Sequence, residues 1–371
     1  MTMETMETME QQSENTDLKP KDTSSHAKEI SERFTDNGGS YDMVVKKMLN
    51  DGHEGELCLW LKEVSLIRSD MNCLTESCNG KSLTWQPSRV VDKYCWYCTN
   101  CKKKQFIRDS SFFLQIKCEL KICMQIIVAW CQFTPSEVVV SYLGLKHFVV
   151  RKTYEKLAKV AELYVVNHIN EWILGGPDKI IIIDEYPSGY MTETLINAPV
   201  TKRRNNNNCH TILCMAEVKD IPPRMWMHIM NANPESISPK NAKNQKQATK
   251  CGMVEEALKE ICAHAKPGSY LIANKKARCC NYESLKELKD YKVVSLEGLQ
   301  THDTPGKNEL LNNIETIWQT GIEVCEDIQD TTRAQGLQFF YLHLWRQRFA
   351  TTPASAFEHI IQHIAECFPF T

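Results

Sequence analysis

The spacing of five cysteines predicts a metal site. Cys73-x4-Cys78 and Cys95-x2-Cys98-x2-Cys101 form two knuckles on either side of a short intervening stretch. Two knuckles joined by a hairpin are typical of a zinc ribbon, in which four thiolates close a tetrahedral site. We predict Cys73, Cys78, Cys98 and Cys101 as ligands of a structural Zn²⁺ ion, with Cys95 as an alternate for either later cysteine. The alternative is that these cysteines are buried small side chains without a metal.

A second candidate site follows the apolar run Ile180-Ile-Ile-Ile183, which ends in Asp184 and Glu185. Four consecutive isoleucines are typical of a strand that is buried on both faces of a sheet. A buried strand that ends on a carboxylate is typical of a metal-dependent nuclease core, where carboxylates hold two Mg²⁺ ions. The alternative is that both acids only terminate the strand.

Positive charge is concentrated in one part of the chain. The formal net charge is -2, so contact with nucleic acid would depend on a local patch. Residues 81–160 hold fourteen Lys and Arg against five Asp and Glu, a local net charge of about +9. We expect DNA contacts from eight of these side chains, although a solvated helix face would carry similar charges. They are Lys102, Lys103, Lys104, Arg108, Lys146, Arg151, Lys152 and Lys156.

The basic residues from Lys146 onward lie in a segment whose pattern predicts a helix-turn-helix. Apolar periodicity predicts helices at about 112–131, 135–143 and 147–167. Thr134 is the expected N-cap of the second helix, with Pro135 at its first position and Gly144 at its end. A helix, a short glycine turn and a basic helix are typical of DNA-binding domains, with the last helix in the major groove.

The elements around Asp184 predict an α/β fold. Strands at about 180–185, 210–218 and 225–230 follow in hairpin order, the second hairpin turning at 220–223. Strands at 270–273 and 291–296 then alternate with helices at about 251–265, 282–289 and 308–327. This order predicts an RNase H-like mixed sheet with helices on both faces. Two further helices, at about 331–349 and 353–367, close the chain.

Composition divides the chain into five expected regions. They are a disordered tail (1–40), short helices with the zinc ribbon (41–110), the helix-turn-helix (111–170), the RNase H-like domain (175–330) and C-terminal helices (331–371). Residues 231–250 are a polar insertion that we expect to be mobile. The chain contains no apolar run of the roughly 20 residues that span a membrane. Seventeen cysteines without a secretory signal indicate reduced thiols in an intracellular protein.

The order of these motifs resembles the Merlin superfamily of DDE transposases. The resemblance is carried by the ribbon, the helix-turn-helix and the segment 175–185, Gly-Gly-Pro-Asp-Lys-Ile-Ile-Ile-Ile-Asp-Glu. It covers roughly residues 45–350. Further matching stretches are 101–113, 267–272, 312–318 and 342–346.

The resemblance implies a degenerate catalytic triad. Asp184 matches the first catalytic carboxylate and Glu315 the third. At the second position, where the family has an aspartate, this chain has Asn274, followed by two lysines. An amide oxygen lacks the charge with which a carboxylate holds Mg²⁺ between two sites. The family's Asn-His signature after the last strand is also missing, since Val293-Val-Ser-Leu-Glu297 stands there.

These observations favour a domesticated, transposase-derived protein of the nucleus that binds DNA and does not cleave it. Zn²⁺ is its expected structural cofactor, and Mg²⁺ is required only if the site is active. A homodimer or chromatin-associated protein partners are expected, and no membrane. One alternative is an active DDE transposase that cleaves and transfers DNA strands, with Glu185 or Glu297 substituting for Asn274. The other alternative is a protein-interaction scaffold without DNA binding.

Overall fold

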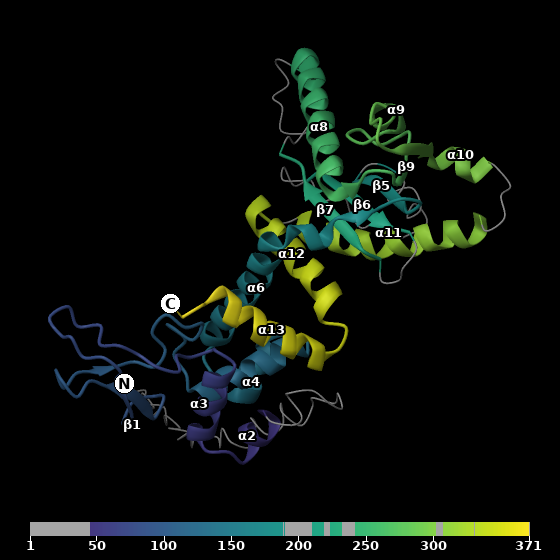
Figure 1. The fold of residues 1–371 in the computed structure, drawn as a ribbon. Coiled ribbons are helices and arrows are strands. Elements are labelled where there is room, and N and C mark those ends of the chain that lie inside the picture. Colours follow the sequence, from purple (N-terminus) through teal and green to yellow (C-terminus); the bar gives the residue numbers. More distant parts are fainter. Residues whose placement is uncertain are drawn as a thin grey trace, which may run out of the picture.

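The chain is a mixed α/β protein in which a helical body joins a small sheet to a larger one (Figure 1). The computed structural model describes residues 45–187, 189, 210–218, 223–231, 242–301, 307–329 and 331–370. The predicted tail at 1–40 and most of the predicted turn at 220–223 lie outside these residues. The described chain begins with two short helices, α2 (Lys46–Asn50) and α3 (Glu54–Glu63).

The small sheet contains three antiparallel strands in the order β1-β2-β3. They are β1 (Thr84–Pro87), β2 (Tyr94–Tyr97) and β3 (Lys104–Gln105). Its core is minimal: the Trp85 ring stacks on Tyr94 and meets Trp96 edge-on, and the Lys62 ammonium lies 3.4 Å from the Trp85 ring centre. A sheet of this size buries too little apolar surface to be stable alone.

The helical body combines segments from both halves of the chain. Its helices are α4 (Leu120–Cys131), α5 (Ser136–Leu143), α6 (His147–Asn167), α12 (Arg333–Phe349) and α13 (Pro353–Cys367). Both α12 and α13 pack against α6, and α13 also packs against α4 (Figure 1). The C-terminal helices were expected as a separate region; instead they pack on α6 and α4 and share one core with them.

The larger sheet has five strands in the order β10-β9-β5-β6-β7. They are β5 (Ile180–Tyr186), β6 (Ile212–Glu217), β7 (Met225–Ile229), β9 (Tyr270–Ala273) and β10 (Lys292–Ser295). Strand β6 runs antiparallel to both β5 and β7, whereas β9 and β10 run parallel to β5. The isoleucine strand is therefore the central strand, and Ile181, Ile182 and Ile183 are buried as predicted. A separate short pair, β4 (Leu174–Gly175) and β8 (Ala265–Lys266), runs parallel beside it.

Helices cover both faces of this sheet. Side chains of adjacent paired residues share a face, and neighbours along a strand alternate. Trp226 of β7 donates a hydrogen bond to Glu260 of α8 (Ala242–His264), so α8 covers the Trp226 face. Cys214 of β6 lies on the other face, 3.8 Å Sγ to Sγ from Cys325 of α11 (Lys307–Gln329). Figure 1 shows α8 and α11 on opposite sides of the strands.

Three helix boundaries differ from the sequence-based expectation. The first helix of the body begins at Leu120 and not near residue 112, because the carbonyls of the preceding segment accept bonds from Arg108 and Lys156. Helix α5 begins at Ser136, since Pro135 is extended (ψ 143°) and is itself the N-cap. The expected polar insertion ends early, because α8 already begins at Ala242; residues 232–241 lie outside the described chain.

The remaining short elements connect the sheet to its helices. A 3-10 helix, η2 (Ile169–Trp172), leads from α6 into β4. Helix α9 (Tyr282–Leu285) lies between β9 and β10, where a helix over 282–289 was expected. Helix α10 (Leu296–Thr301) follows β10 directly.

Candidate functional site: a cysteine cluster, a basic surface and the ends of two strands

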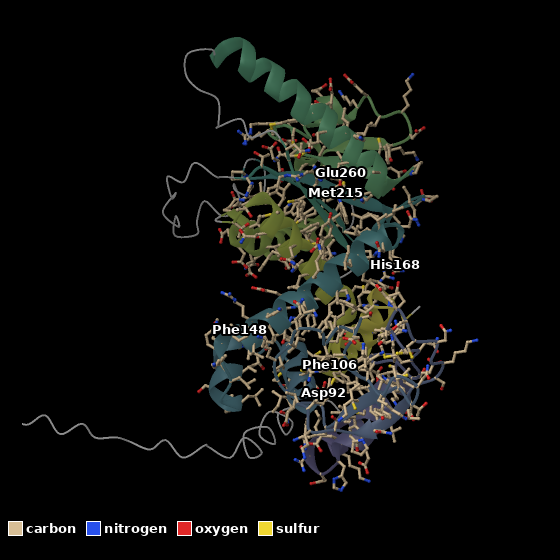
Figure 2. All side chains as sticks on the ribbon, turned by 90° about the vertical axis from the view of Figure 1, so that its left-hand side faces the viewer. Asp92, Phe106, Phe148, His168, Met215 and Glu260 are labelled. Carbon is tan, nitrogen blue, oxygen red and sulfur yellow. The ribbon has the colours of Figure 1, made fainter. Side chains whose placement is uncertain are left out.

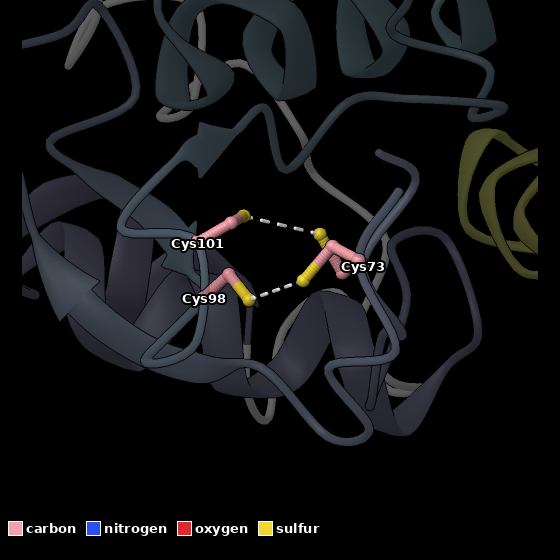
Figure 3. Close-up of side chains that lie close together, drawn as sticks. Cys73, Cys98 and Cys101 are labelled. Atoms are coloured by element: carbon pink, nitrogen blue, oxygen red, sulfur yellow. Dashed lines mark hydrogen bonds between the residues drawn. The ribbon is translucent and has the colours of Figure 1, made fainter. Parts of the chain in front are cut away.

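Four cysteines converge at one end of the small sheet. The Sγ atoms of Cys73, Cys78, Cys98 and Cys101 all lie within 4.8 Å of one another. Cys73 is 3.5 Å from Cys101, and Cys78 is 3.7 Å from Cys98 (Figure 3). Tetrahedral zinc with Zn–S bonds of about 2.3 Å places its sulfurs about 3.8 Å apart. The cluster therefore has the donor set and the spacing to hold a metal ion such as zinc.

The backbone around the cluster is shaped to bring the sulfurs together. Cys73 N–H donates to the Gly80 carbonyl, and Lys102 N–H donates to the Cys98 carbonyl. A Cβ atom at Gly80 would lie 2.7 Å from the Cys98 sulfur, so only glycine fits this knuckle. Cys95, the predicted alternate ligand, is buried in β2 and is not a member of the cluster.

The thiols of the cluster cannot all ionise without a compensating charge. Hydrogen bonds to Thr75 lower the pKa of Cys73 to about 6. A backbone N–H at Cys101 favours the Cys98 thiolate, yet burial and the bonds shared with Cys101 and Cys78 raise the pKa of Cys98 to about 11. Amides of Asn100 and Gln105 donate to the sulfurs of Cys78 and Cys73, at 3.3 and 3.4 Å. A bound cation is what would hold four thiolates together here.

Three of the predicted DNA-contacting lysines form an exposed turn beside the cluster. Lys102, Lys103 and Lys104 directly follow Cys101, and all three are exposed. Lys102 adopts a positive φ of 61°, which turns the chain back into β3. The cysteine cluster therefore positions this basic turn.

Arg108 has a structural role in place of the expected DNA contact. It is buried, and its Nε lies 2.9 Å from both carboxylate oxygens of Asp92. Its remaining donors reach the carbonyls of Ile116 and Cys118, both at 2.6 Å. Burial alone would lower the pKa of Arg108, but the bond to Asp92 raises it above its ordinary value. The guanidinium thus connects the β1–β2 loop to the segment that precedes α4.

Lys156 also points into the protein. Its ammonium donates to the carbonyls of Phe112 and Leu114, and burial lowers its pKa. Lys146 and Arg151 are exposed at the start of α6, where Arg151 pairs with Glu155 at 3.5 Å. Lys152, half-buried, donates to Gln115 at 3.2 Å. Of the eight predicted DNA contacts, the fully exposed ones are therefore Lys102, Lys103, Lys104, Lys146 and Arg151.

Asp184 and Asn274 lie side by side at the ends of adjacent parallel strands. Ile183 pairs with Ala273, so the next residues of the two strands, Asp184 and Asn274, stand at the same level. Adjacent strands are about 4.8 Å apart. Asp184 also pairs with Cys214, whose side chain faces α11. Asp184 therefore lies on the face that α11 covers.

The polar atoms at these strand ends already have partners in the protein. Asp184 is 1 % exposed, and its Oδ1 accepts the Glu185 N–H at 2.8 Å. Any side chain at Gly189 would collide with this carboxylate, so the backbone at Gly189 lies directly against it. The Oδ1 atom of Asn274 accepts the Lys276 N–H at 2.8 Å. Asp184 Oδ1 and Asn274 Oδ1 were expected to face a metal ion, but both accept hydrogen bonds from nearby backbone N–H groups.

Neither alternative acid completes the site. Glu185 is fully buried and accepts three bonds: from the N–H groups of Arg278 and Cys279, at 2.7 and 2.8 Å, and from the Arg278 guanidinium at 2.9 Å. Glu297 accepts the Lys275 N–H at 3.0 Å and follows β10, two strands away from β5.

Glu315 differs from this pair in its exposure to solvent. It is exposed on α11, beside the buried Ile314, Ile317 and Trp318. Within the described ranges, no group of three or more Cys, His, Asp or Glu other than the cysteine cluster lies within metal-binding reach.

Sequence reasoning missed a polar contact between α8 and β7. Glu260 Oε1 lies 2.8 Å from Trp226 Nε1, 3.4 Å from His228 Nδ1 and 3.2 Å from His264 Nδ1. The other nitrogen of His228 lies 2.8 Å from Glu256. Figure 2 shows Glu260 of α8 next to Met215, the β6 residue that pairs with Trp226. The i, i+4 spacing of Glu256 and Glu260 was the available sequence pattern, but their partners are on a distant strand.

No family model matches the chain, and no curated protein or solved structure matches it. None of the helices in the described part of the chain is both long and apolar enough to cross a bilayer.

Proposed function

We propose that this chain is a transposase-derived protein that binds DNA in the nucleus and has lost DNA cleavage. The observation that carries the loss of cleavage is the amide of Asn274. At the level of Asp184, where a second carboxylate is needed, the Asn274 oxygen is occupied by the Lys276 N–H. Two Mg²⁺ ions need charged oxygen ligands that face a common space.

An RNase H-like origin for the larger sheet is supported by its topology. An antiparallel three-stranded meander, β5-β6-β7, is extended by the parallel strands β9 and β10 on the other side of β5. Helices cover both faces, and Asp184 ends the central strand. This arrangement is the one the sequence motifs predict, and it supports the resemblance to DDE transposases of the Merlin superfamily.

DNA binding is supported by the N-terminal part of the chain. The cysteine cluster, with Zn²⁺ as the proposed ion, would fix a zinc ribbon that presents Lys102, Lys103 and Lys104. Helices α5 and α6 are joined at Gly144, which adopts the left-handed conformation (φ 61°). This is the helix-turn-helix order, with exposed basic residues on the first turns of the second helix. A homodimer or chromatin-associated proteins are the proposed further partners.

The test measures binding of the full chain to a random-sequence DNA duplex at several salt concentrations between about 50 and 200 mM. These measurements give the slope of log K against log salt. We expect affinity to fall steeply, because each neutralised phosphate contributes about -0.9 to the slope of log K against log salt. Replacing Lys102, Lys103 and Lys104 by alanine should reduce the slope by up to about 3. Replacing Lys286 and Lys289, next to α9, should leave it unchanged. Binding without salt dependence would instead favour the scaffold alternative.

A nicking assay on supercoiled plasmid with Mg²⁺ or Mn²⁺ tests the loss of cleavage. The wild-type chain should leave the plasmid intact. Metal-dependent nicking that Asp184→Ala abolishes would establish the active-transposase alternative.

A further inference from the structure

Phe148 is an exposed aromatic residue where a DNA-reading helix would meet base edges. It is the second residue of α6 and is 45 % exposed, whereas Val149 and Val150 beside it are buried in the helical body. Phe148 therefore does not serve the core. Figure 2 shows it at the margin of the helical body, where α6 begins.

The surroundings of Phe148 are basic. Lys146 precedes it, and Arg151 and Lys152 follow on the next turn. Lys152 lies four residues from Phe148, so the two side chains share a face of α6. Through its bond to Gln115, Lys152 joins this face to Leu114, which is 42 % exposed. We call Phe148, Lys152, Gln115 and Leu114 the reading face.

Acidic residues near the reading face are already paired. Glu137 of α5 lies 3.4 Å from His147, and Glu155 lies 3.5 Å from Arg151. Both pairs are exposed, and exposed pairs hold their partners weakly. A polyanion can therefore displace Glu137 and Glu155 from their basic partners. The reading face then presents its apolar side chains between positive charges.

We propose that Phe148 reads duplex DNA by packing against thymine methyl groups in the major groove. In helix-turn-helix proteins the N-terminal residues of the second helix contact base edges, and the first helix crosses the backbone. The thymine methyl is the apolar mark of the major groove, and phenylalanine is among the side chains that pack on it. Lys146, Arg151 and Lys152 hold the flanking phosphates. This inference rests on the proposed function, because it names what the proposed DNA-binding helix recognises.

Charge complementarity selects DNA over an apolar protein partner. One exposed phenylalanine and one partly exposed leucine offer little area for a protein interface, whereas the cations around them match a phosphate backbone. The same reasoning excludes Lys156 from the contact, because its ammonium is bonded to the carbonyls of Phe112 and Leu114.

The experiment begins with a selection of duplexes that the full-length chain retains from a random-sequence pool. The best duplex is then made in a second form in which uracil replaces thymine, which removes only the methyl groups. Binding of both forms is measured for the wild-type chain, for Phe148→Ala and for the control Phe339→Ala. Phe339 is a comparably exposed phenylalanine (40 %), on α12.

We expect the wild-type chain and Phe339→Ala to bind the uracil form about fourfold more weakly for each methyl contacted, since a buried methyl contributes about 0.8 kcal/mol. Phe148→Ala should bind both forms equally and keep the wild-type salt slope. The proposal is overturned if the wild-type chain does not distinguish the two forms, or if Phe148→Ala still does. Absence of salt-dependent binding by the wild-type chain would overturn the proposed function as well, so the two failures are distinguishable.

Discussion

The cysteine cluster and the ends of β5 and β9 are two polar sites on opposite kinds of scaffold. At the cluster, four thiol ligands converge on a small sheet with almost no core. At the strand ends, Asp184 and Asn274 sit on a five-stranded sheet whose central isoleucines are fully buried between helices. The first scaffold depends on its ligands, whereas the second is stable without any. A ligand can therefore be lost from the second site while the fold persists, but not from the first.

The largest expected effect is that of removing the metal proposed for the cluster. Binding free energies of about 10–16 kcal/mol hold zinc-finger peptides folded. Chelation, or Cys98→Ser, should therefore unfold the segment 71–105 and leave the larger sheet intact. Hydrogen exchange should show rapid exchange of the amides of β1 and β2 and continued protection of those of β5 and β6.

Cys262→Ser is the matched control for this experiment, because Cys262 is an exposed cysteine on α8. It should leave both sheets protected. If chelation exposed β5 as well, the two scaffolds would be a single cooperative unit, and the comparison would fail.

The next effect concerns the connection between the small sheet and the helical body. Arg108→Ala should destabilise the folded chain by about 3–5 kcal/mol, because it leaves the buried Asp92 carboxylate without its partner. Arg151→Ala removes an exposed pair and should cost less than about 1 kcal/mol. Denaturant unfolding of the metal-loaded chain measures both. If the two variants lost the same unfolding free energy, Arg108 would not hold the small sheet to the helical body.

The contrast between Arg108 and Arg151 also shows how far the sequence was informative. Patterns that repeat along the chain predict the isoleucine strand, the bounds of α6 and α13, and the four cysteines that converge. Contacts between residues that are distant in the sequence are not predicted in this way. Nothing in the sequence around Arg108 indicates that its guanidinium will bind Asp92. The sequence likewise marks Asn274 as a departure from the pattern of the family that the chain resembles, but only the fold shows that its oxygen accepts the Lys276 N–H.

A smaller effect tests whether the strand ends lack only one ligand. Asn274→Asp places a carboxylate beside Asp184, and we expect Mg²⁺ to stabilise this variant more than the wild-type chain. A tenfold excess of Mg²⁺ over the dissociation constant corresponds to about 1.4 kcal/mol. Thermal unfolding with and without Mg²⁺ measures this gain, and adding Asp184→Asn should remove it. Stabilisation of the wild-type chain that depends on Asp184 would mean that the site is already complete.

The smallest expected effect is a pH dependence where α8 docks on β7. His228 lies between Glu256 and Glu260, with one ring nitrogen near each carboxylate. Burial would lower the pKa of His228, but its bonds to Glu260 and Glu256 raise it above the ordinary 6.5. Burial would raise the pKa of Glu260, but His228 holds it below 4.5. The ion pair between His228 and Glu260 is therefore strongest at pH values between the lowered pKa of Glu260 and the raised pKa of His228.

Comparing His228→Gln with the wild-type chain isolates this contribution. Because the folded pKa of His228 is raised, its stabilisation is complete below pH 6.5 and is lost as pH rises through that raised value. Burial lowers the pKa of the neighbouring His264, so His264 opposes folding below pH 6.5, but it is present in both chains. The difference in unfolding free energy should therefore be larger at pH 6 than at pH 9. The exposed pair His147–Glu137 provides the control, and His147→Gln should show a much smaller change. A pH-independent difference for His228→Gln would mean that α8 is held on the sheet by packing alone, and that the larger sheet depends on no charged group at this contact.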